Sequence, residues 1–317
     1  MNIVILDSYT TNPGDLNWDS LKALGNCTIY ERTTSREIIS RCIDADIIII
    51  NKVILSKEIL NLLPKLKFIT ILATGYNVVD IKAAEELNIS VSNVPEYSTK
   101  SVAQIVFAHI LNFCHHIENH SLSVHNGNWS NSQDFCYWNS PLIELSNKKL
   151  GIIGFGKIGK EVSKIAMAFG MKILIHSRSK INNLPKDIKE VDIETIFRNS
   201  DYITLHCPLN KENKQFINAK RLNTMKPSAF LINTSRGGLI NESDLADVLN
   251  KNIITGAGLD VLSEEPPVNR SPLIGAKNCY ITPHIAWATF EARKRLIDVT
   301  VENVKAFIDN KCQNTVN

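Results

Sequence analysis

Short apolar segments alternate with amphipathic segments along the first 95 residues of the chain. The apolar segments are rich in isoleucine and valine, and the segments between them repeat apolar residues at helical spacing. This alternation predicts βαβ units and a parallel sheet. The expected strands are 2–7, 27–31, 46–50, 67–71 and 89–92. The expected helices are 16–24, 35–42, 56–63 and 78–87.

The same alternation resumes at Lys149, after a region that breaks it. In that region a long helical pattern covers 99–120, and residues 121–147 are expected to form an irregular excursion. The chain ends in a second long helical pattern at 288–309. The expected strands of the second alternating region are 149–153, 172–176, 202–206, 229–233, 254–259 and 279–281. The pattern predicts an α/β protein with two doubly wound parallel-sheet domains.

Composition and charge agree with an ordinary globular protein. The 317 residues are 44% apolar and 21% charged, and this length suggests two domains. The net charge of +3 comes from charges scattered along the chain. We therefore expect neither a nucleic acid partner nor a membrane partner.

The cysteines and the N-terminus favour a cytoplasmic protein. Seven cysteines stand at irregular spacing without a C-x-x-C pair, so neither a metal site nor a disulfide framework is expected. The chain starts directly with an apolar strand and lacks the features of a signal peptide. The apolar runs at 47–50 and 105–113 are too short to span a bilayer.

A glycine-rich loop, G-F-G-K-I-G at 154–159, lies between an expected strand and an amphipathic helix. In this context Gly154 permits a tight turn, Gly156 lets the backbone approach a pyrophosphate, and Gly159 permits close packing of helix on strand. The first N–H groups of the helix then face the phosphates. The loop residues are candidates for binding a dinucleotide: Gly154, Phe155, Gly156, Lys157, Ile158 and Gly159. The alternative is a turn that only joins strand to helix.

The end of the next strand bears on the choice of dinucleotide. Sites for NAD usually place a carboxylate there to bind the ribose 2′-hydroxyl, but this chain has Ser177, Arg178 and Ser179. A guanidinium flanked by two hydroxyls suits a phosphate group. We therefore expect NADP(H) to be the preferred cofactor. The alternative is that Arg178 is a solvated loop residue and that the protein uses NAD(H).

Three further residues follow expected strands of the second domain. Arg236 comes just after an apolar strand, Glu265 precedes two prolines, and His284 follows Pro283. Ligands of a doubly wound sheet bind beyond the carboxyl ends of its strands. Each residue has a structural alternative, since Arg236 could be a surface cation, His284 a structural histidine and Glu265 a turn cap. Glu264 is a rival to Glu265.

At these residues the chain resembles the D-isomer-specific 2-hydroxyacid dehydrogenase family, over nearly its whole length. The motifs that carry the resemblance are G-F-G-K-I-G at 154–159, H-C-P-L at 206–209, N-T-S-R-G-G at 233–238, G-L-D-V at 258–261, E-E-P-P at 264–267 and T-P-H at 282–284. The start of the chain and D-F-C-Y-W at 134–138 are most similar to the glycerate dehydrogenases and hydroxypyruvate reductases of that family.

The resemblance implies an oxidoreductase that transfers a hydride from NAD(P)H to a small 2-keto acid, giving a D-2-hydroxy acid. Hydroxypyruvate and glyoxylate are the expected substrates. His284 would give the proton to the carbonyl oxygen, Glu265 would orient its ring, and Arg236 would bind the substrate carboxylate.

The resemblance also implies further contacts with the cofactor and the substrate. The backbone at Thr74, Gly75 and Tyr76 would hold the substrate carboxylate. Lys52 would assist an anionic substrate or be solvated, and Trp138 would reach the active site of a partner subunit or pack in an ordinary interface. Beyond the glycine loop, the cofactor would contact Cys207, Pro208, Thr234, Ser235 and Asp260, the last at the nicotinamide amide. His206 is expected only to end a strand.

The family fold implies a discontinuous, flavodoxin-like substrate domain, residues 1–98 with 289–317, and a Rossmann cofactor domain, residues 99–288. It also implies a homodimer formed through the cofactor domain. Two alternatives remain at this point. The chain could have another activity of the family, or it could be a non-catalytic, nucleotide-sensing protein like the corepressors that share this fold.

Overall fold

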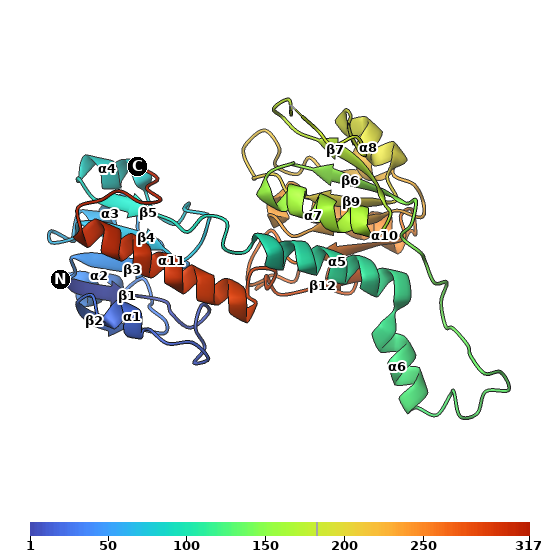
Figure 1. The fold of residues 1–317 in the computed structure, drawn as a ribbon, viewed down its shortest axis with the longest axis horizontal. Helices are drawn as coiled ribbons and strands as arrows, with labels where there is room; N and C mark the ends of the chain where they lie inside the picture. The colour runs from blue at the N-terminus through green and yellow to red at the C-terminus, as the bar shows by residue number, and fades with distance from the viewer. Residues whose placement is uncertain (182) are drawn as a thin grey trace. The chain divides into compact units, whose positions relative to one another are not determined.

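In the computed structural model, residues 1–181 and 183–317 are described, and they form two compact units (Figure 1). Unit 1 comprises Met1–Ser98 and Trp287–Asn317, and unit 2 comprises Thr99–Ala286. The chain therefore leaves unit 1 once and returns to it at Trp287, two residues before the expected return at residue 289.

Unit 1 contains a five-stranded parallel sheet with the order β2-β1-β3-β4-β5. Its strands are β1 (Asn2–Ile5), β2 (Asn26–Ile29), β3 (Ile47–Ile50), β4 (Phe68–Ile71) and β5 (Ser90–Ser92). Its helices are α1 (Asp19–Lys22), α2 (Ile38–Cys42), α3 (Lys57–Leu60), α4 (Ile81–Glu86) and α11 (Phe290–Ile308). This strand order is the flavodoxin-like one, so the fold expected for this part of the chain is confirmed.

Both faces of the unit 1 sheet are covered by helices. Residues of α1 and α11 pack with Ile47 and Ile49 on one face. Residues of α2, α3 and α4 pack with Ile48 and Ile50 on the other. Burial on both faces explains why β3 is a continuous run of isoleucine instead of an alternating pattern.

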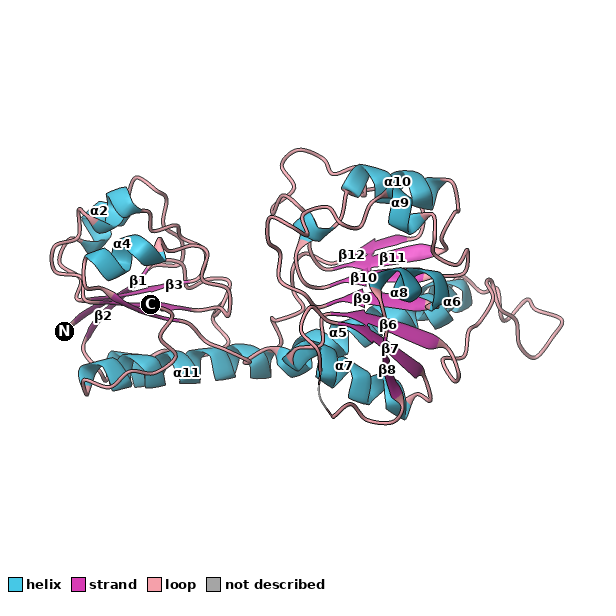
Figure 2. Cartoon of the chain, turned by 90° about the horizontal axis from the view of Figure 1, so that it is seen from above, coloured by secondary structure: helices cyan, strands magenta, loops and turns pink. Residues whose placement is uncertain are grey.

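Unit 2 contains a seven-stranded parallel sheet with the order β12-β11-β10-β9-β6-β7-β8 (Figure 2). Its strands are β6 (Lys149–Ile153), β7 (Lys172–His176), β8 (Ile188–Glu190), β9 (Tyr202–Leu205), β10 (Phe230–Asn233), β11 (Gly256–Leu259) and β12 (Cys279–Ile281). Its helices are α5 (Thr99–His115), α6 (Ile117–His125), α7 (Lys157–Ala168), α8 (Ile193–Asn199), α9 (Ala219–Leu222), α10 (Glu242–Asn250) and the short 3-10 helix η1 (Gly237–Leu239). The order extends the Rossmann pattern, as expected.

The helices of unit 2 form a layer on each side of its sheet (Figure 2). The helices α5 and α7 cover one face, where Val106, Ile110 and Val162 are buried. The other face is covered by α8, α9 and α10, with Phe197 and Leu245 in its core. The carboxyl ends of all these strands lie along one edge, because the strands are parallel. The strand order reverses at β6, and ligands of such sheets bind at this point.

Three sequence-based expectations were wrong in detail. The long helix expected at 99–120 is two helices, because His116 has a left-handed backbone with φ 45°. The second of them, α6, continues to His125, inside the segment expected to be irregular. Strand β8 was not expected at all, because only Ile188 of its three residues is buried and so no apolar run marks it.

Within the described residues, no helix is both long and apolar enough to cross a membrane.

Candidate active site

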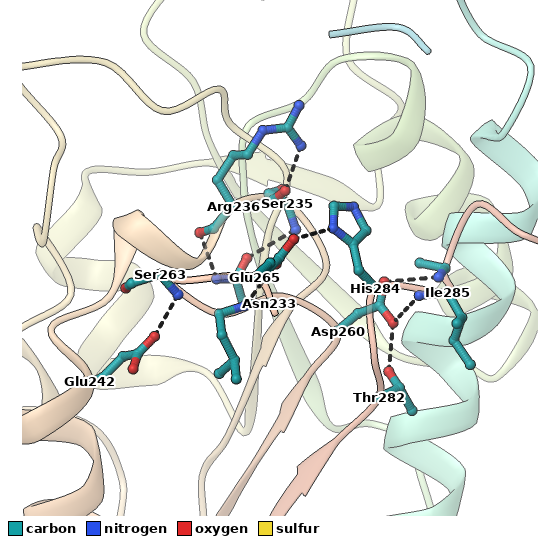
Figure 3. A network of polar contacts seen from close by, with 12 residues as sticks. Asn233, Ser235, Arg236, Glu242, Asp260, Ser263, Glu265, Thr282, His284 and Ile285 are labelled. Carbon is teal, nitrogen blue, oxygen red and sulfur yellow. Dashed lines mark hydrogen bonds and ion pairs between the residues drawn. The ribbon is translucent and has the colours of Figure 1, made fainter. Parts of the chain in front are cut away.

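The ends of β10, β11 and β12 bring the three expected catalytic residues into one region of unit 2 (Figure 3). Asn233 at the end of β10 pairs in register with Leu259 of β11, which pairs with Ile281 of β12. Since each strand ends at this level, the residues that follow the three strands lie next to one another. Arg236 follows β10, Glu265 lies in the loop after β11, and His284 follows β12.

His284 and Glu265 form the central contact of this region. The ring Nδ1 of His284 lies 2.5 Å from Oε2 of Glu265, and both side chains are about one-third exposed. The other carboxylate oxygen of Glu265 accepts a hydrogen bond of 2.9 Å from the backbone N–H of Leu262. Within the described part of the chain, no hydrogen bond is made by Nε2 of His284. The arrangement fixes the ring by one nitrogen and leaves the other for a ligand.

Glu264 points elsewhere. Its carboxylate oxygens lie 3.4 and 3.3 Å from the side-chain amide of Asn269. Nearby, Glu242 at the start of α10 accepts hydrogen bonds of 2.6 Å from the Ser263 N–H and from the Ser271 hydroxyl. These contacts hold the loop after β11 so that Glu265, and not its neighbour, faces the histidine.

Arg236 is exposed, and its turn is shaped by the buried Asn233. The Asn233 side chain accepts from the Ser235 N–H at 3.0 Å and donates to the Arg236 carbonyl at 2.9 Å, as asparagine does in tight turns. The guanidinium donates to the Ser235 carbonyl at 2.7 Å. A Cβ on Gly237 would lie 1.9 Å from the carbonyl carbon of Leu262. Glycine there lets the arginine turn lie directly against the loop that carries Glu265.

The glycine loop makes two close backbone approaches at the start of α7. Gly154 has φ 95°, and a Cβ there would lie 2.6 Å from the backbone of His206 and Cys207. A Cβ on Gly159 would lie 2.3 Å from the Gly154 carbonyl oxygen, so α7 packs closely on the loop. Gly156 caps α7 and has open space where its Cβ would be. No side chain caps the first turn of α7, and the start of a helix with free N–H groups is suited to bind an anion.

Two buried polar atoms near these strand ends have no hydrogen-bond partner among the described residues: Thr234 Oγ1 and His206 Nδ1. The other ring nitrogen of His206 lies 2.9 Å from the Thr204 hydroxyl. Burial lowers the pKa of His206 to about 3, so this ring is neutral near pH 7. Unsatisfied buried polar groups are rare and often mark a ligand position. The residues present thus fit a bound dinucleotide.

The other expected cofactor residues follow the strands β7, β9 and β10. Ser177 is half-buried at the end of β7, whereas Arg178 and Ser179 are exposed. Cys207 is half-buried, Pro208 is exposed, and the Ser235 hydroxyl donates to the Leu205 carbonyl at 2.6 Å.

Asp260 differs from these residues, because it is 1% exposed and its carboxylate accepts three hydrogen bonds from the segment after β12. These contacts were not anticipated from the sequence, since no motif indicates where a buried carboxylate finds its donors.

In unit 1, the expected substrate residues follow β3 and β4. Asp7 accepts hydrogen bonds from the N–H groups of Asn51 at 2.7 Å, of Lys52 at 2.5 Å and of Val53 at 3.0 Å, and burial raises its pKa. Lys52 and Thr74 are exposed.

The loop containing Thr74, Gly75 and Tyr76 is tied to the segment after β5. The Thr74 hydroxyl donates to the Val94 carbonyl at 2.9 Å, and Asn93 donates to the Thr74 carbonyl at 2.7 Å. In unit 2, Trp138 lies between α6 and β6 and is 64% exposed. Across the described ranges, no group of three or more histidines, cysteines or carboxylates is placed to hold a metal ion.

Comparison with known proteins identifies the region that carries this site. A family model described as D-isomer specific 2-hydroxyacid dehydrogenase, NAD binding domain, matches residues 107–286. The chain is 46% identical over 321 residues to a hydroxypyruvate reductase of Blautia hydrogenotrophica, covering 100% of both chains. It is 42% identical over 290 residues to a glycerate dehydrogenase of Methylorubrum extorquens, covering 90% of each. A solved structure of an acyclic imino acid reductase in complex with NADPH and D-Arg is similar, with a TM-score of 0.87, 33% identity and 100% coverage of both chains.

Proposed function

The chain belongs to the D-isomer specific 2-hydroxyacid dehydrogenase family, and we propose that it reduces hydroxypyruvate to D-glycerate or glyoxylate to glycolate. The observation that carries the proposal is the contact of 2.5 Å between His284 and Glu265, placed beside Arg236 at adjacent strand ends. The similarity to a hydroxypyruvate reductase and a glycerate dehydrogenase supports the substrate.

His284 is the proposed proton donor to the carbonyl oxygen of the substrate. Glu265 accepts the Nδ1 hydrogen, which fixes the tautomer and the orientation of the ring. In the doubly protonated ring Nε2 carries a second hydrogen, which is the proton proposed to pass to the carbonyl oxygen of a bound keto acid. In the oxidative direction the same nitrogen takes the proton back.

Arg236 is the proposed partner of the substrate carboxylate. Its planar guanidinium can donate two parallel hydrogen bonds to a carboxylate, a geometry that the ammonium of lysine cannot match. It also stabilises the negative charge that develops on the carbonyl oxygen during reduction. Thr74, Gly75 and Tyr76 are proposed to bind the substrate through their backbone, and Lys52 to attract its negative charge.

The expected cofactor residues of unit 2 are proposed to bind the dinucleotide. The match of residues 107–286 to a family model described as an NAD binding domain supports this proposal. The glycine loop and the start of α7 would hold the pyrophosphate, with Cys207, Pro208, Thr234 and Ser235 at neighbouring strand ends. Asp260 remains a predicted contact of the nicotinamide amide. When bound, the nicotinamide supplies the hydride.

Replacing Glu265 by Gln tests the catalytic assignment, and Glu264→Gln is the matched control. A glutamine has only one acceptor oxygen, so it cannot accept the hydrogen bonds from the Leu262 N–H and from the His284 ring that the two carboxylate oxygens of Glu265 accept. We expect Glu265→Gln to lower kcat/KM for hydroxypyruvate by about 100-fold or more and Glu264→Gln to stay close to wild type. Reduction is followed as loss of NAD(P)H absorbance. Equal activity of both variants would refute the assigned role of Glu265, and a wild-type protein without turnover would favour a non-catalytic nucleotide-binding protein.

The cofactor preference is proposed to be NADP(H), carried by Arg178 with Ser177 and Ser179. We expect wild-type kcat/KM to be higher with NADPH than with NADH. Arg178→Ala should lower the value for NADPH by about 10- to 100-fold, because charge-assisted hydrogen bonds to the phosphate are lost. The value for NADH should barely change. Lys172→Ala, at the opposite end of β7, is the control and should alter neither value. Equal or better use of NADH by the wild type would contradict the preference.

A homodimer formed through unit 2 is also proposed. The segment 117–142 exposes many large apolar side chains, and Phe135 is 88% exposed. The others are Ile117, Leu122, Val124, Trp129, Trp138 and Leu142. Exposed apolar side chains gathered on one segment mark an interaction surface. In such a dimer, Trp138 of each subunit would extend toward the partner subunit.

Sedimentation analysis tests the dimer. We expect a particle of about twice the 35.5 kDa chain mass, and a smaller particle for the double variant Leu122→Asp, Phe135→Asp. The control Lys220→Asp, on α9, should leave the mass unchanged. A monomeric wild type at micromolar concentration would contradict the proposal.

A further inference from the structure

The buried carboxylate of Asp260 holds the segment that carries His284 (Figure 3). One oxygen accepts from the Thr282 hydroxyl at 2.6 Å and from the Ile285 N–H at 2.9 Å. The other accepts from the Ala286 N–H at 2.8 Å. We propose that Asp260 is a positioning residue that places His284 through the backbone on both sides of it. The proposal rests on the proton-donor role assigned above to His284.

His284 needs such support because its backbone is left-handed, with φ 54°. Non-glycine residues adopt this conformation at a cost, and it persists only where the surroundings determine it. The His284 N–H donates to the carbonyls of Asp260 at 2.8 Å and of Thr282 at 2.9 Å. Asp260 therefore contacts His284 through its backbone carbonyl and the next two residues through its side chain.

Burial makes these contacts strong. Asp260 is 1% exposed, and a carboxylate removed from water is stable only when its oxygens are hydrogen-bonded. All three donors to the Asp260 carboxylate, one hydroxyl and two backbone N–H groups, come from the segment 282–286. A movement of that segment would leave the buried charge without partners. The carboxylate and the segment consequently hold each other in one position.

Helix α5 contacts both ends of the segment 282–286. His109 of α5 is buried, with Nε2 at 3.5 Å from the Thr282 hydroxyl. Since Thr282 gives its single proton to Asp260, its contact with His109 is as an acceptor. A Cβ on Gly258 would lie 2.8 Å from the Cβ and Cγ of His109, so the helix packs directly on β11. The Ser101 hydroxyl donates to the Ala286 carbonyl at 2.5 Å, which ties the end of the segment to the same helix.

Thr282 permits a test, because its hydroxyl donates to the Asp260 carboxylate and Thr282 itself is not proposed to bind a ligand. Thr282→Val keeps the volume and removes the hydroxyl donor, and Thr282→Ser keeps the donor. In Thr282→Val we expect kcat to fall about 10-fold, with KM for hydroxypyruvate and for NADPH within about 2-fold of wild type. Thr282→Ser should restore kcat. Loss of an interaction that acts only on the proton donor lowers kcat without weakening ligand binding.

Hydrogen exchange of the substrate-free protein gives a second measurement that does not need turnover. The N–H groups of Ile285 and Ala286 should exchange faster in Thr282→Val than in wild type, and at the wild-type rate in Thr282→Ser. Should Thr282→Val fail to fold, Asp260→Asn replaces it. The asparagine side chain keeps one acceptor oxygen, and we expect it to face the two donors Thr282 and Ile285. The Ala286 N–H then loses its acceptor, so it should exchange faster than the Ile285 N–H.

Two results would overturn the proposal. Unchanged exchange at both N–H groups would show that the carboxylate does not hold the segment, whether or not the protein reduces a keto acid. A raised KM for NADPH with unchanged kcat would assign Asp260 to the nicotinamide amide instead. Failure of the proposed function would appear separately, as a wild-type protein that exchanges as expected but has no activity.

Discussion

The parallel register of β10, β11 and β12 determines which side chains can meet in unit 2. The three strands end at the same level, so the residues that follow them are neighbours although they are far apart in sequence. Arg236, Glu265 and His284 each follow one of these strands. Two further contacts bring these residues close to one another. Gly237 lies directly against Leu262, and Asp260 accepts a hydrogen bond from Ile285, next to His284.

Much of this arrangement could be predicted from the sequence. Apolar strand patterns followed by polar residues located the strand ends, and parallel strands align those ends along one edge. The order of the motifs gave the family, which is confirmed by the match over residues 107–286. The glycine spacing at 154–159 predicted a close turn, and the φ of 95° at Gly154 shows the conformation that requires glycine.

Other features depend on contacts that no local pattern records. The break at His116 requires a left-handed backbone at a residue that is not glycine. Strand β8 has one buried residue, so its pairing with β7 leaves no apolar signal. Glu265 faces His284 and Glu264 faces Asn269 because of the conformation of their loop, which no local sequence pattern records. The donors to Asp260 come from residues that follow it by 22 to 26 positions.

The site is proposed to reduce hydroxypyruvate to the D enantiomer of glycerate. The most direct test is to incubate the purified protein with hydroxypyruvate and NADPH and to separate the product on a chiral column. The proposed function predicts D-glycerate, formed in proportion to the NADPH consumed. Formation of L-glycerate, or the absence of glycerate, would contradict it.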